Sequence, residues 1–362
     1  MIKSQIFLTA IFLSITCGLV TADSSWTDKI NLKGDMRYRS ETIDTEGKQT
    51  RPRQRIRLRF GAEAMLMQEL KVVLQMASGS EDPISTNQTM GEAFSTKRLG
   101  IDLAYFDWQP GGAEGVSFIG GKMKNPFYKV GKTELIWDGD LNPEGLALKL
   151  SGAGESSKIF VNLGGFPVVE RKNDKDAVLY GMQGGFHFDL NQGRGHLLFG
   201  LSYFDYGNTQ GNLPFYNVNK SFGNSLDVAG LYLEDYNLLE AFLELGMKAG
   251  STTLVFFFDY VDNTAAEAEN RGWLAGLTLG KTKATGSCAF RYNYRDLEKD
   301  AVLGAFTDSD FRGAGTDAKG HEFGFDYQIA KPVKASVTYF NNEIGIQEDS
   351  FHRLQLDLNL KY

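Results

Sequence analysis

The sequence is poor in cysteine and proline, and it has no apolar run long enough for a helix that spans a bilayer. Two cysteines and eight prolines stand among 362 residues. The one long apolar run covers residues 6–20, which is short of the roughly 20 residues that a transmembrane helix needs. With a mean hydropathy of −0.27, the chain does not fit a bundle of membrane helices. The net charge of −7 at pH 7 excludes a general affinity for nucleic acid.

Glycine and aromatic residues are abundant instead. The chain has 41 glycines, 26 phenylalanines and 15 tyrosines, a composition that suits many strands and turns. A chain of this length could form two or three soluble domains, but all-β barrels also reach it as a single domain.

The N-terminal segment has the features of a secretory signal peptide. Lys3 supplies a positive n-region, residues 6–20 supply an apolar h-region, and Ala22 ends a small-residue cleavage site. We therefore predict a signal peptide at residues 1–22 and one mature domain, a β-barrel pore, at residues 23–362.

Two other interpretations of this segment are disfavoured. A single membrane anchor would need a longer apolar run. A lipoprotein signal would need Gly or Ala before Cys17, where the sequence has Thr16. Signal cleavage leaves Cys288 as the one cysteine of the predicted mature chain, so an internal disulfide is not expected.

Residues 53–66, RQRIRLRFGAEAML, alternate between two faces without a break. Because a strand places successive side chains on opposite faces, one face is apolar and the other is a column of guanidinium groups. The apolar face has Ile56, Leu58, Phe60, Ala62, Ala64 and Leu66, and the polar face has Arg53, Arg55, Arg57, Arg59 and Glu63. As a helix, the segment would scatter the arginines around its axis. The solvated face of a soluble sheet is the alternative that this segment alone leaves open.

A second strand, predicted within residues 29–42, precedes this one and has the same two-sided pattern. Its polar row includes Arg37 and Arg39. Two neighbouring strands therefore place arginines on the same face of the predicted sheet.

The alternation recurs along the rest of the chain, and the connections between segments are short and long in turn. The predicted outward rows include Leu70, Val72, Leu74 and Met76; Leu99, Ile101, Leu103 and Tyr105; Leu146, Leu148 and Leu150; Tyr180, Met182 and Phe186; and Leu354, Leu356, Leu358 and Leu360. Residues 239–247 also fit a short amphipathic helix, but every odd residue there is apolar, which favours a strand. In residues 116–123, neighbouring glycines blur the alternation and leave the lipid-facing side open.

About sixteen strands follow from this pattern, and the number is even. Each is near the length that a tilted strand needs to cross a bilayer. A soluble sandwich does not require an apolar row on every strand or long connections at one end only. We therefore predict an all-β fold, a transmembrane antiparallel β-barrel.

The loop at residues 124–144, KNPFYKVGKTELIWDGDLNPE, follows the fifth predicted strand and is the third loop on the long-loop side. Its residues 125–127 (NPF) and the sequence ELIWDGDLNPEG at 134–145 resemble the signature of the putative porins of Gram-negative outer membranes. The alternating last strand, which ends at Tyr362, resembles the C-terminal signal that the barrel-assembly machinery reads.

This resemblance implies a general-porin-like, 16-stranded barrel that crosses the cell outer membrane and contacts its lipid. It also implies a homotrimer of water-filled pores, each narrowed by a third extracellular loop folded inward, and an encounter with the barrel-assembly machinery.

The residues of the loop also indicate that it folds into the lumen. Phe127, Tyr128, Leu135, Ile136 and Trp137 are too apolar for a loop exposed to water. If the loop lies in the lumen, its acids are available to face the wall arginines, and the two rows would screen solutes by charge. The candidate constriction residues are Arg37, Arg39, Arg55, Arg57, Arg59, Glu134, Asp138 and Asp140. A purely structural role, in which the ion pairs fix the loop to the wall, is an equal alternative.

No motif predicts catalysis, a metal or a cofactor. Asp138, Asp140 and Asn142 resemble the start of a calcium loop, but Pro143 stands where that loop needs Gly. The four histidines have no metal-ligand spacing. We therefore expect a channel, not an enzyme, that passes small hydrophilic solutes and ions by passive diffusion. The alternatives are a pore selective for anions such as phosphate or carboxylates and, with less support, an adhesin or structural barrel.

Overall fold

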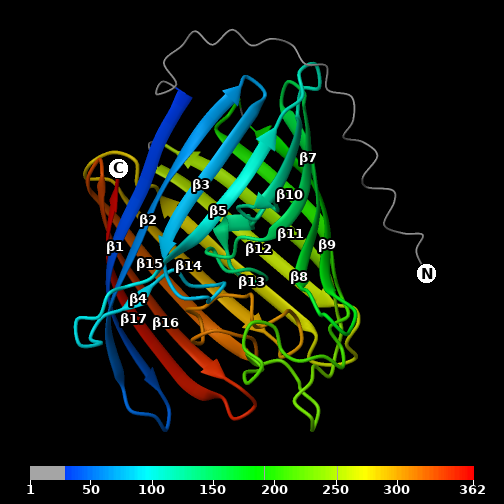
Figure 1. Cartoon of the computed structure of the whole chain (residues 1–362). Coiled ribbons are helices and arrows are strands. Elements are labelled where there is room, and N and C mark those ends of the chain that lie inside the picture. Colours follow the sequence, from blue (N-terminus) through cyan, green and yellow to red (C-terminus); the bar gives the residue numbers. More distant parts are fainter. Residues whose placement is uncertain (1–28, 191, 251) are drawn as a thin grey trace.

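The computed structural model describes residues 29–190, 192–250 and 252–362 and shows a β-barrel (Figure 1). The predicted signal peptide lies outside these residues and stays a prediction. In the part of the chain that is described, no helix is long and apolar enough to cross a membrane.

Sixteen long strands and one two-residue strand make up the sheet. They are β1 (Ile30–Thr45), β2 (Arg51–Met67), β3 (Leu70–Ser78), β4 (Gln88–Thr89), β5 (Leu99–Trp108), β6 (Val116–Lys122), β7 (Glu144–Ala153), β8 (Ser157–Val169), β9 (Ala177–Leu190), β10 (Gly195–Gly207), β11 (Tyr236–Ala249), β12 (Thr252–Asn263), β13 (Arg271–Gly280), β14 (Cys288–Leu297), β15 (Ala318–Ala330), β16 (Val333–Ile344) and β17 (Asp349–Lys361). One short 3₁₀ helix, η2 (Val130–Lys132), lies between β6 and β7.

The barrel is closed because β1 pairs with β2 on one side and with β17 on the other. Every pairing is antiparallel, and β4 adds a two-residue bridge to β2. Closure gives each long strand a neighbour on both sides, so the sheet has no free edge strand among the described residues. The predicted antiparallel barrel of about sixteen strands is confirmed.

Outward and inward side chains alternate as the sequence predicts. Leu32 on β1 is 71% exposed and Leu201 on β10 is 61% exposed, whereas the inward Arg39 and Ser202 on the same strands are 5% and 3% exposed. The strand prediction for residues 239–247 is also confirmed, since they lie within β11.

The predicted outward row of residues 99–105 is wrong in its second half. Leu99 and Ile101 are exposed, but Asp102 and Leu103 are both buried, and Tyr105 packs against the inner core. The cause is a register shift between β3 and β5 that leaves Asp102 as an extra residue. Because side chains alternate with period two, one extra residue moves all later side chains to the other face.

The orientation of β6, which the sequence leaves open, is set by its neighbours. Phe118 is exposed on the outer face and stacks on Trp108 of β5, with 5.6 Å between the ring centroids. Ser117 and Ile119 line a cavity inside the barrel.

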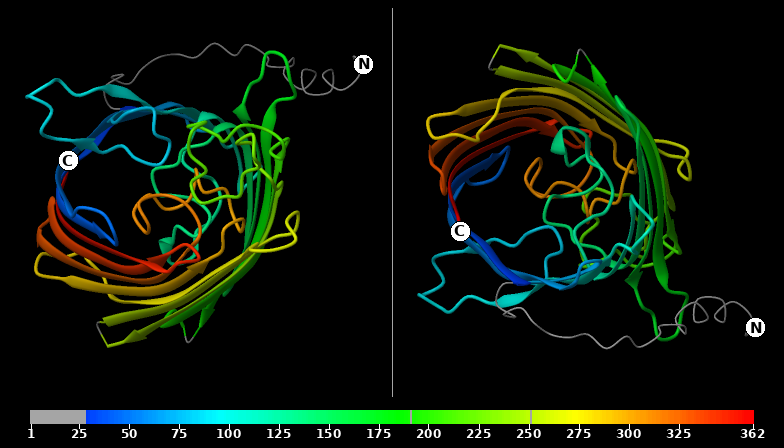
Figure 2. Two further views of the ribbon diagram at one scale, coloured as in Figure 1. Left: turned by 90° about the horizontal axis from the view of Figure 1, so that it is seen from below. Right: turned by 90° about the horizontal axis from the view of Figure 1, so that it is seen from above.

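The long connections gather at one end of the barrel, and several turn into it. We refer to residues 79–98 as loop 2, 123–143 as loop 3, 208–235 as loop 5 and 298–317 as loop 7. Figure 2 shows loop 3 and loop 7 inside the ring of strands, at the side of β8 to β14.

The hydrophobic core lies inside the barrel. Buried side chains of loop 3, loop 5 and loop 7 form one cluster with inward side chains of β8 to β14, among them Phe127, Trp137, Phe204, Tyr232 and Leu303. The loops therefore fill one side of the lumen, and polar space remains beside β1, β2 and β14 to β17.

Candidate pore constriction

Loop 3 is attached to the inner wall at its first half. The side-chain amide of Gln183 on β9 bonds both backbone groups of Tyr128, accepting from its N–H at 2.6 Å and donating to its carbonyl at 3.0 Å. The Glu244 carboxylate on β11 accepts from the Gly131 N–H at 3.0 Å and from the Tyr128 hydroxyl at 3.1 Å. The bond from Gly131 satisfies a backbone N–H that η2 leaves unpaired, and the Gln183 bonds satisfy the backbone of the segment before η2.

Gly131 meets a steric requirement at the same point. Its φ of 56° is in the left-handed region, which costs other residues about 1–2 kcal/mol. A Cβ there would also lie 2.5 Å from the Phe257 ring. Glycine thus lets loop 3 approach β12 closely.

The second half of loop 3 packs on aromatic wall residues and on loop 7. The indole N–H of Trp137 donates to the Tyr206 hydroxyl at 2.8 Å, and the Trp137 and Phe204 ring centroids are 4.4 Å apart. The Asp138 N–H donates to the Phe306 carbonyl of loop 7 at 2.8 Å. Loop 7 therefore packs against loop 3 and holds it in position.

The wall arginines come together because β1 and β2 are paired. Arg37 lies opposite Arg57, and Arg39 lies opposite Arg55, with all four on the inward face. Together with Arg59 they form the arginine wall, whose side chains are 6–24% exposed.

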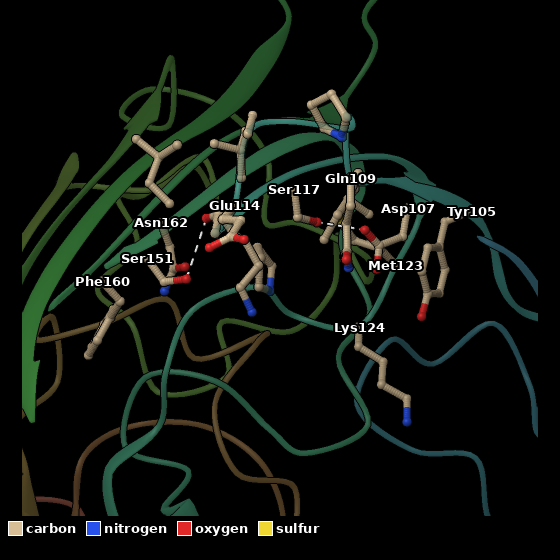
Figure 3. A pocket seen from close by; sticks show the side chains of 18 of the residues that line it. Tyr105, Asp107, Gln109, Glu114, Ser117, Met123, Lys124, Ser151, Phe160 and Asn162 are labelled. Carbon is tan, nitrogen blue, oxygen red and sulfur yellow. Dashed lines mark hydrogen bonds between the residues drawn. The ribbon is translucent and has the colours of Figure 1, made fainter. Parts of the chain in front are cut away.

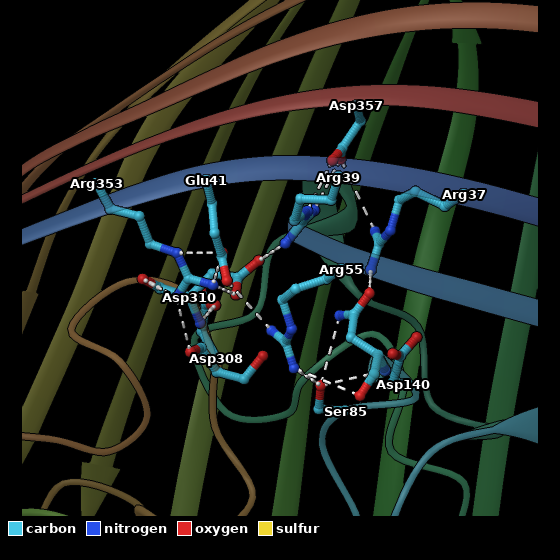
Figure 4. Close-up of polar contacts among 12 residues, drawn as sticks. Arg37, Arg39, Glu41, Arg55, Ser85, Asp140, Asp308, Asp310, Arg353 and Asp357 are labelled. Atoms are coloured by element: carbon cyan, nitrogen blue, oxygen red, sulfur yellow. Dashed lines mark hydrogen bonds and ion pairs between the residues drawn. The ribbon is translucent and has the colours of Figure 1, made fainter. Parts of the chain in front are cut away.

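Two arginines of neighbouring strands share one carboxylate of loop 7 (Figure 4). Asp310 lies 2.9 Å from Arg39 and 2.7 Å from Arg353 of β17. Arg39 also pairs with Asp357 at 2.7 Å, and Arg353 with Glu41 at 2.6 Å. Burial raises the pKa of Asp310, but the charges of Arg353 and Arg39 outweigh it and lower the pKa overall.

The other wall arginines differ in how close a carboxylate lies to neutralise the guanidinium charge. Arg57 and Arg59 share Asp35, at 2.8 and 2.9 Å. Arg37 has its nearest carboxylate, that of Asp357, at 4.0 Å, and instead donates to the side-chain oxygen of Asn87 at 2.7 Å.

Arg55 has weaker contacts. Its guanidinium lies 3.6 Å from Glu41 and 3.4 Å from the Ser85 hydroxyl.

Of the three predicted loop acids, one faces the arginine wall. Asp140 lies 3.5 Å from Arg59 and 3.7 Å from Arg57. Asp138 is turned toward loop 7, where one of its oxygens accepts from the Ser309 N–H at 2.8 Å.

Glu134 belongs to a group of acids with Asp138 and Asp308. Carboxylate oxygens of the three lie within 4.8 Å of one another, and Asp308 pairs with Arg295 at 3.0 Å. Burial and the neighbouring Asp138 and Asp308 charges raise the pKa of Glu134 well above its usual range. Three carboxylates at this spacing could coordinate a cation, and Arg295 already supplies a positive charge beside them.

Two polar spaces that are lined by β1 and loop 3 adjoin the candidate constriction residues. The first, of about 260 Å³, lies between β1, β14 to β17, loop 3 and loop 7. Among the described residues, six basic and six acidic side chains line it: Arg37, Arg39, Lys132, Arg291, Arg295 and Lys334, and Glu134, Asp308, Asp310, Glu322, Asp326 and Asp357.

The second space, of about 490 Å³, lies toward the short-turn end and is more basic. Its charged lining is Lys33, Arg59, Lys124, Lys129 and Lys361 against Asp35, Asp102 and Asp138. We call this second volume the basic space.

Sequence reasoning missed several residues of the constriction. Arg353 and Asp357 lie in the polar row of the last strand, and the same alternation that selects Arg37 and Arg39 could have selected them. Loop 7 has apolar residues beside its acids, such as Phe306 and Phe311, which is the signal that marked loop 3. Loop 2 has a weaker signal of the same kind, with Ile84 and Phe94 close to its acids, and its Thr86 hydroxyl donates to Asp140 at 2.9 Å.

Comparison with known proteins agrees with this fold. OprB of Pseudomonas putida, solved at high pH, aligns with a TM-score of 0.61 and 12% sequence identity, over 93% of this chain and 95% of that chain. OmpF of Salmonella typhi, solved in complex with daunomycin, has a TM-score of 0.56 and 13% identity, over 93% and 99% of the two chains. A triple mutant of the Rhodopseudomonas blastica porin has a TM-score of 0.50 and 12% identity, over 92% and 100%. At these identities the likeness is one of fold.

Among curated proteins, the comparison found no significant match. A family model described as a putative porin matches residues 42–230 and 236–362, which is most of the chain. The chain therefore belongs to the putative porin family and is a β-barrel channel of the outer membrane.

Proposed function

We propose that the protein lets small hydrophilic solutes and ions diffuse passively between the arginine wall and loops 3 and 7. The observation that carries this proposal is the balance of six basic and six acidic side chains around the narrow space of about 260 Å³. A lining with both signs gives polar partners to solutes of either charge, while the small volume excludes large solutes. The charge selectivity of such a pore is weak.

The ion pairs also favour a pore of fixed size. Arg39, Arg353 and Asp310 are held by bonds from three segments, β1, β17 and loop 7. Buried charge pairs with several bonds resist rearrangement because a lost partner is costly. The structural and the screening roles of the candidate residues are therefore compatible.

A pore selective for anions is a second candidate, favoured by two observations. The basic space has five basic side chains against three acidic ones, and Arg37 has its nearest carboxylate 4.0 Å away. A guanidinium without a close carboxylate keeps a net positive charge that attracts carboxylate or phosphate groups.

The zero-current potential in a salt gradient, with the protein in a planar bilayer, separates the two candidates. We would compare the natural chain with Arg37→Ser and Arg59→Ser, and with Arg194→Ser at an exposed turn as the charge-matched control. Passive diffusion predicts weak selectivity that shifts modestly toward cations in the first two variants. A strong anion preference that both variants abolish would establish the anion pore instead, and absence of any conductance would reject both candidates and favour an adhesin or structural role.

Three further expectations rest on the family. We infer removal of residues 1–22 on export from a Gram-negative cell, assembly of the barrel through its last strand, and a homotrimer. N-terminal sequencing of the protein from outer membranes tests the first. Deletion of Tyr362 tests assembly through the last strand, since it should reduce the amount of folded barrel. Native mass spectrometry tests the homotrimer.

A further inference from the structure

A cavity of about 1100 Å³ lies inside the barrel at the short-turn end, apart from the arginine wall (Figure 3). The inner faces of β5 to β8 line one side, and the first part of loop 3 lines the other. Lys124, Asn125 and Lys129 line both this cavity and the basic space. The cavity and the basic space therefore adjoin the same part of loop 3.

The floor of the cavity is apolar. Tyr105, Ile119, Tyr128 and Phe160 line it, and each is half-buried because its other side packs against the core of the barrel. Aromatic and aliphatic surface in contact with water is unfavourable, and a planar solute that covers it would gain that free energy. Such a floor inside a barrel with otherwise polar space is a feature of a binding site.

The aromatic part of the floor is fixed in position. Gln183 bonds both backbone groups of Tyr128, and Glu244 accepts from its hydroxyl. The Tyr128 and Phe160 ring centroids are 6.0 Å apart, with 47° between the planes. Because the side chains are already held in place, binding of a stacked solute costs little side-chain entropy, which favours affinity.

Basic side chains surround this floor. Lys124, Lys132 and Lys149 are exposed to the cavity, and within the described residues none has a carboxylate within 4.0 Å of its ammonium group. Three acids also line the cavity. Asp107 is bonded by Lys71 and Ser117, whereas Glu69 and Glu114 lie at the two turns that close the end. The ammonium groups of Lys124, Lys132 and Lys149 are thus available to bind an anion.

We infer that this cavity binds small aromatic carboxylates, with the ring on Tyr128 and Phe160 and the carboxylate at Lys132 or Lys149. The volume of about 1100 Å³ exceeds that of one such molecule and is slightly above the range of about 300–1000 Å³ that ligand pockets span. The inference deepens the proposed function, since the pore delivers the solute, and it assigns a class of solute that the pore holds during passage.

The test is saturation-transfer NMR on the purified protein in detergent, with benzoate as the probe. Acetate has the charge without the ring, and benzyl alcohol has the ring without the charge. We expect benzoate to bind more tightly than either. Phe160→Leu, which keeps apolar contact with Tyr128 but removes the aromatic face, should raise the dissociation constant about two- to tenfold.

The charge contact has its own variant. Lys149→Gln, on β7 and outside loop 3, should raise the dissociation constant about two- to fivefold, whereas Lys172→Gln, exposed in the loop at residues 170–176, should leave it unchanged. Equal benzoate binding by all variants, or equal binding of benzoate and acetate, would overturn the inference.

Potassium chloride conductance, measured on the same preparations, separates the two proposals. Normal conductance without benzoate binding rejects the binding site and leaves the pore. Benzoate binding that responds to Phe160→Leu and Lys149→Gln, in a protein without conductance, rejects the pore and leaves the binding site.

Discussion

Replacement of Asp310 by asparagine removes the loop 7 charge that lies between two buried arginines. Arg39 and Arg353 are 5% and 2% exposed, and each loses one of two carboxylate partners. A buried ion without any partner costs about 3–5 kcal/mol. Because Asp357 still pairs with Arg39 and Glu41 with Arg353, we expect the free energy of unfolding to fall by about 2–3 kcal/mol.

The same substitution makes the balanced constriction positive by one charge. A unit charge about 5 Å from an ion in water contributes about 0.8 kcal/mol, which screening at 0.1 M salt reduces to about 0.5 kcal/mol. That energy favours an anion about twofold and disfavours a cation by the same factor. The anion-to-cation permeability ratio should therefore rise about fivefold.

Zero-current potentials and urea unfolding in detergent measure the two effects of Asp310→Asn. Asp349→Asn, at the exposed start of β17, makes the same change in net charge away from the constriction. Because the pKa of Asp310 is lowered by Arg353 and Arg39, its stabilising effect is complete above the ordinary aspartate pKa and declines only in stronger acid. The stability difference should thus stay constant from pH 7 to 5. An unchanged permeability ratio, or a change equal to that of Asp349→Asn, would refute the placement of Asp310 at the constriction.

Three further substitutions test other contacts of loop 3. Burial and the neighbouring Asp138 and Asp308 charges raise the pKa of Glu134, so its negative charge is lost at a higher pH than that of an ordinary glutamate. The anion preference of the natural chain should therefore increase as the pH falls, and Glu134→Gln should weaken that pH dependence; an unchanged dependence in zero-current potentials would assign it to another group. Gly131→Ala places a Cβ 2.5 Å from the Phe257 ring at a φ of 56°. We therefore expect loop 3 to shift and the single-channel conductance to change. Unaltered conductance together with unaltered stability would contradict the close packing of loop 3 on β12. Trp137→Phe leaves the buried Tyr206 hydroxyl without its donor, which should lower the free energy of unfolding by about 1–3 kcal/mol; a loss below about 0.5 kcal/mol, measured by urea titration, would show that this bond is dispensable.

The strands were predictable because their signal is local. In the barrel each strand has one apolar and one polar face, so period-two alternation marks its position and outward side from the sequence alone. The prediction was wrong at Leu103 and Tyr105, where the extra residue Asp102 shifts the register between β3 and β5. The apolar residues do change phase between Ile101 and Phe106, but that change does not locate the extra residue, because the position of a bulge depends on the partner strand.

The candidate site likewise has residues that were predictable from local pattern and residues that were not. Arg37, Arg39, Arg55 and Arg57 were predicted to share a face because their strands are adjacent in the chain, and they do. Asp310 lies 271 residues from its partner Arg39, so its contact depends on the closure of the barrel and on the path of loop 7.

The sequence by itself determined the all-β architecture, the outward and inward faces of most strands, and the arginine wall, because each follows from the spacing of residues within one or two neighbouring strands. The tertiary structure alone decided which acids neutralise those arginines and how much of the lumen stays open. Those properties depend on barrel closure, which joins β1 to β17, and on the packing of loops 2, 3, 5 and 7 inside it. Contacts between segments so far apart in the chain are fixed by geometry that no single segment contains.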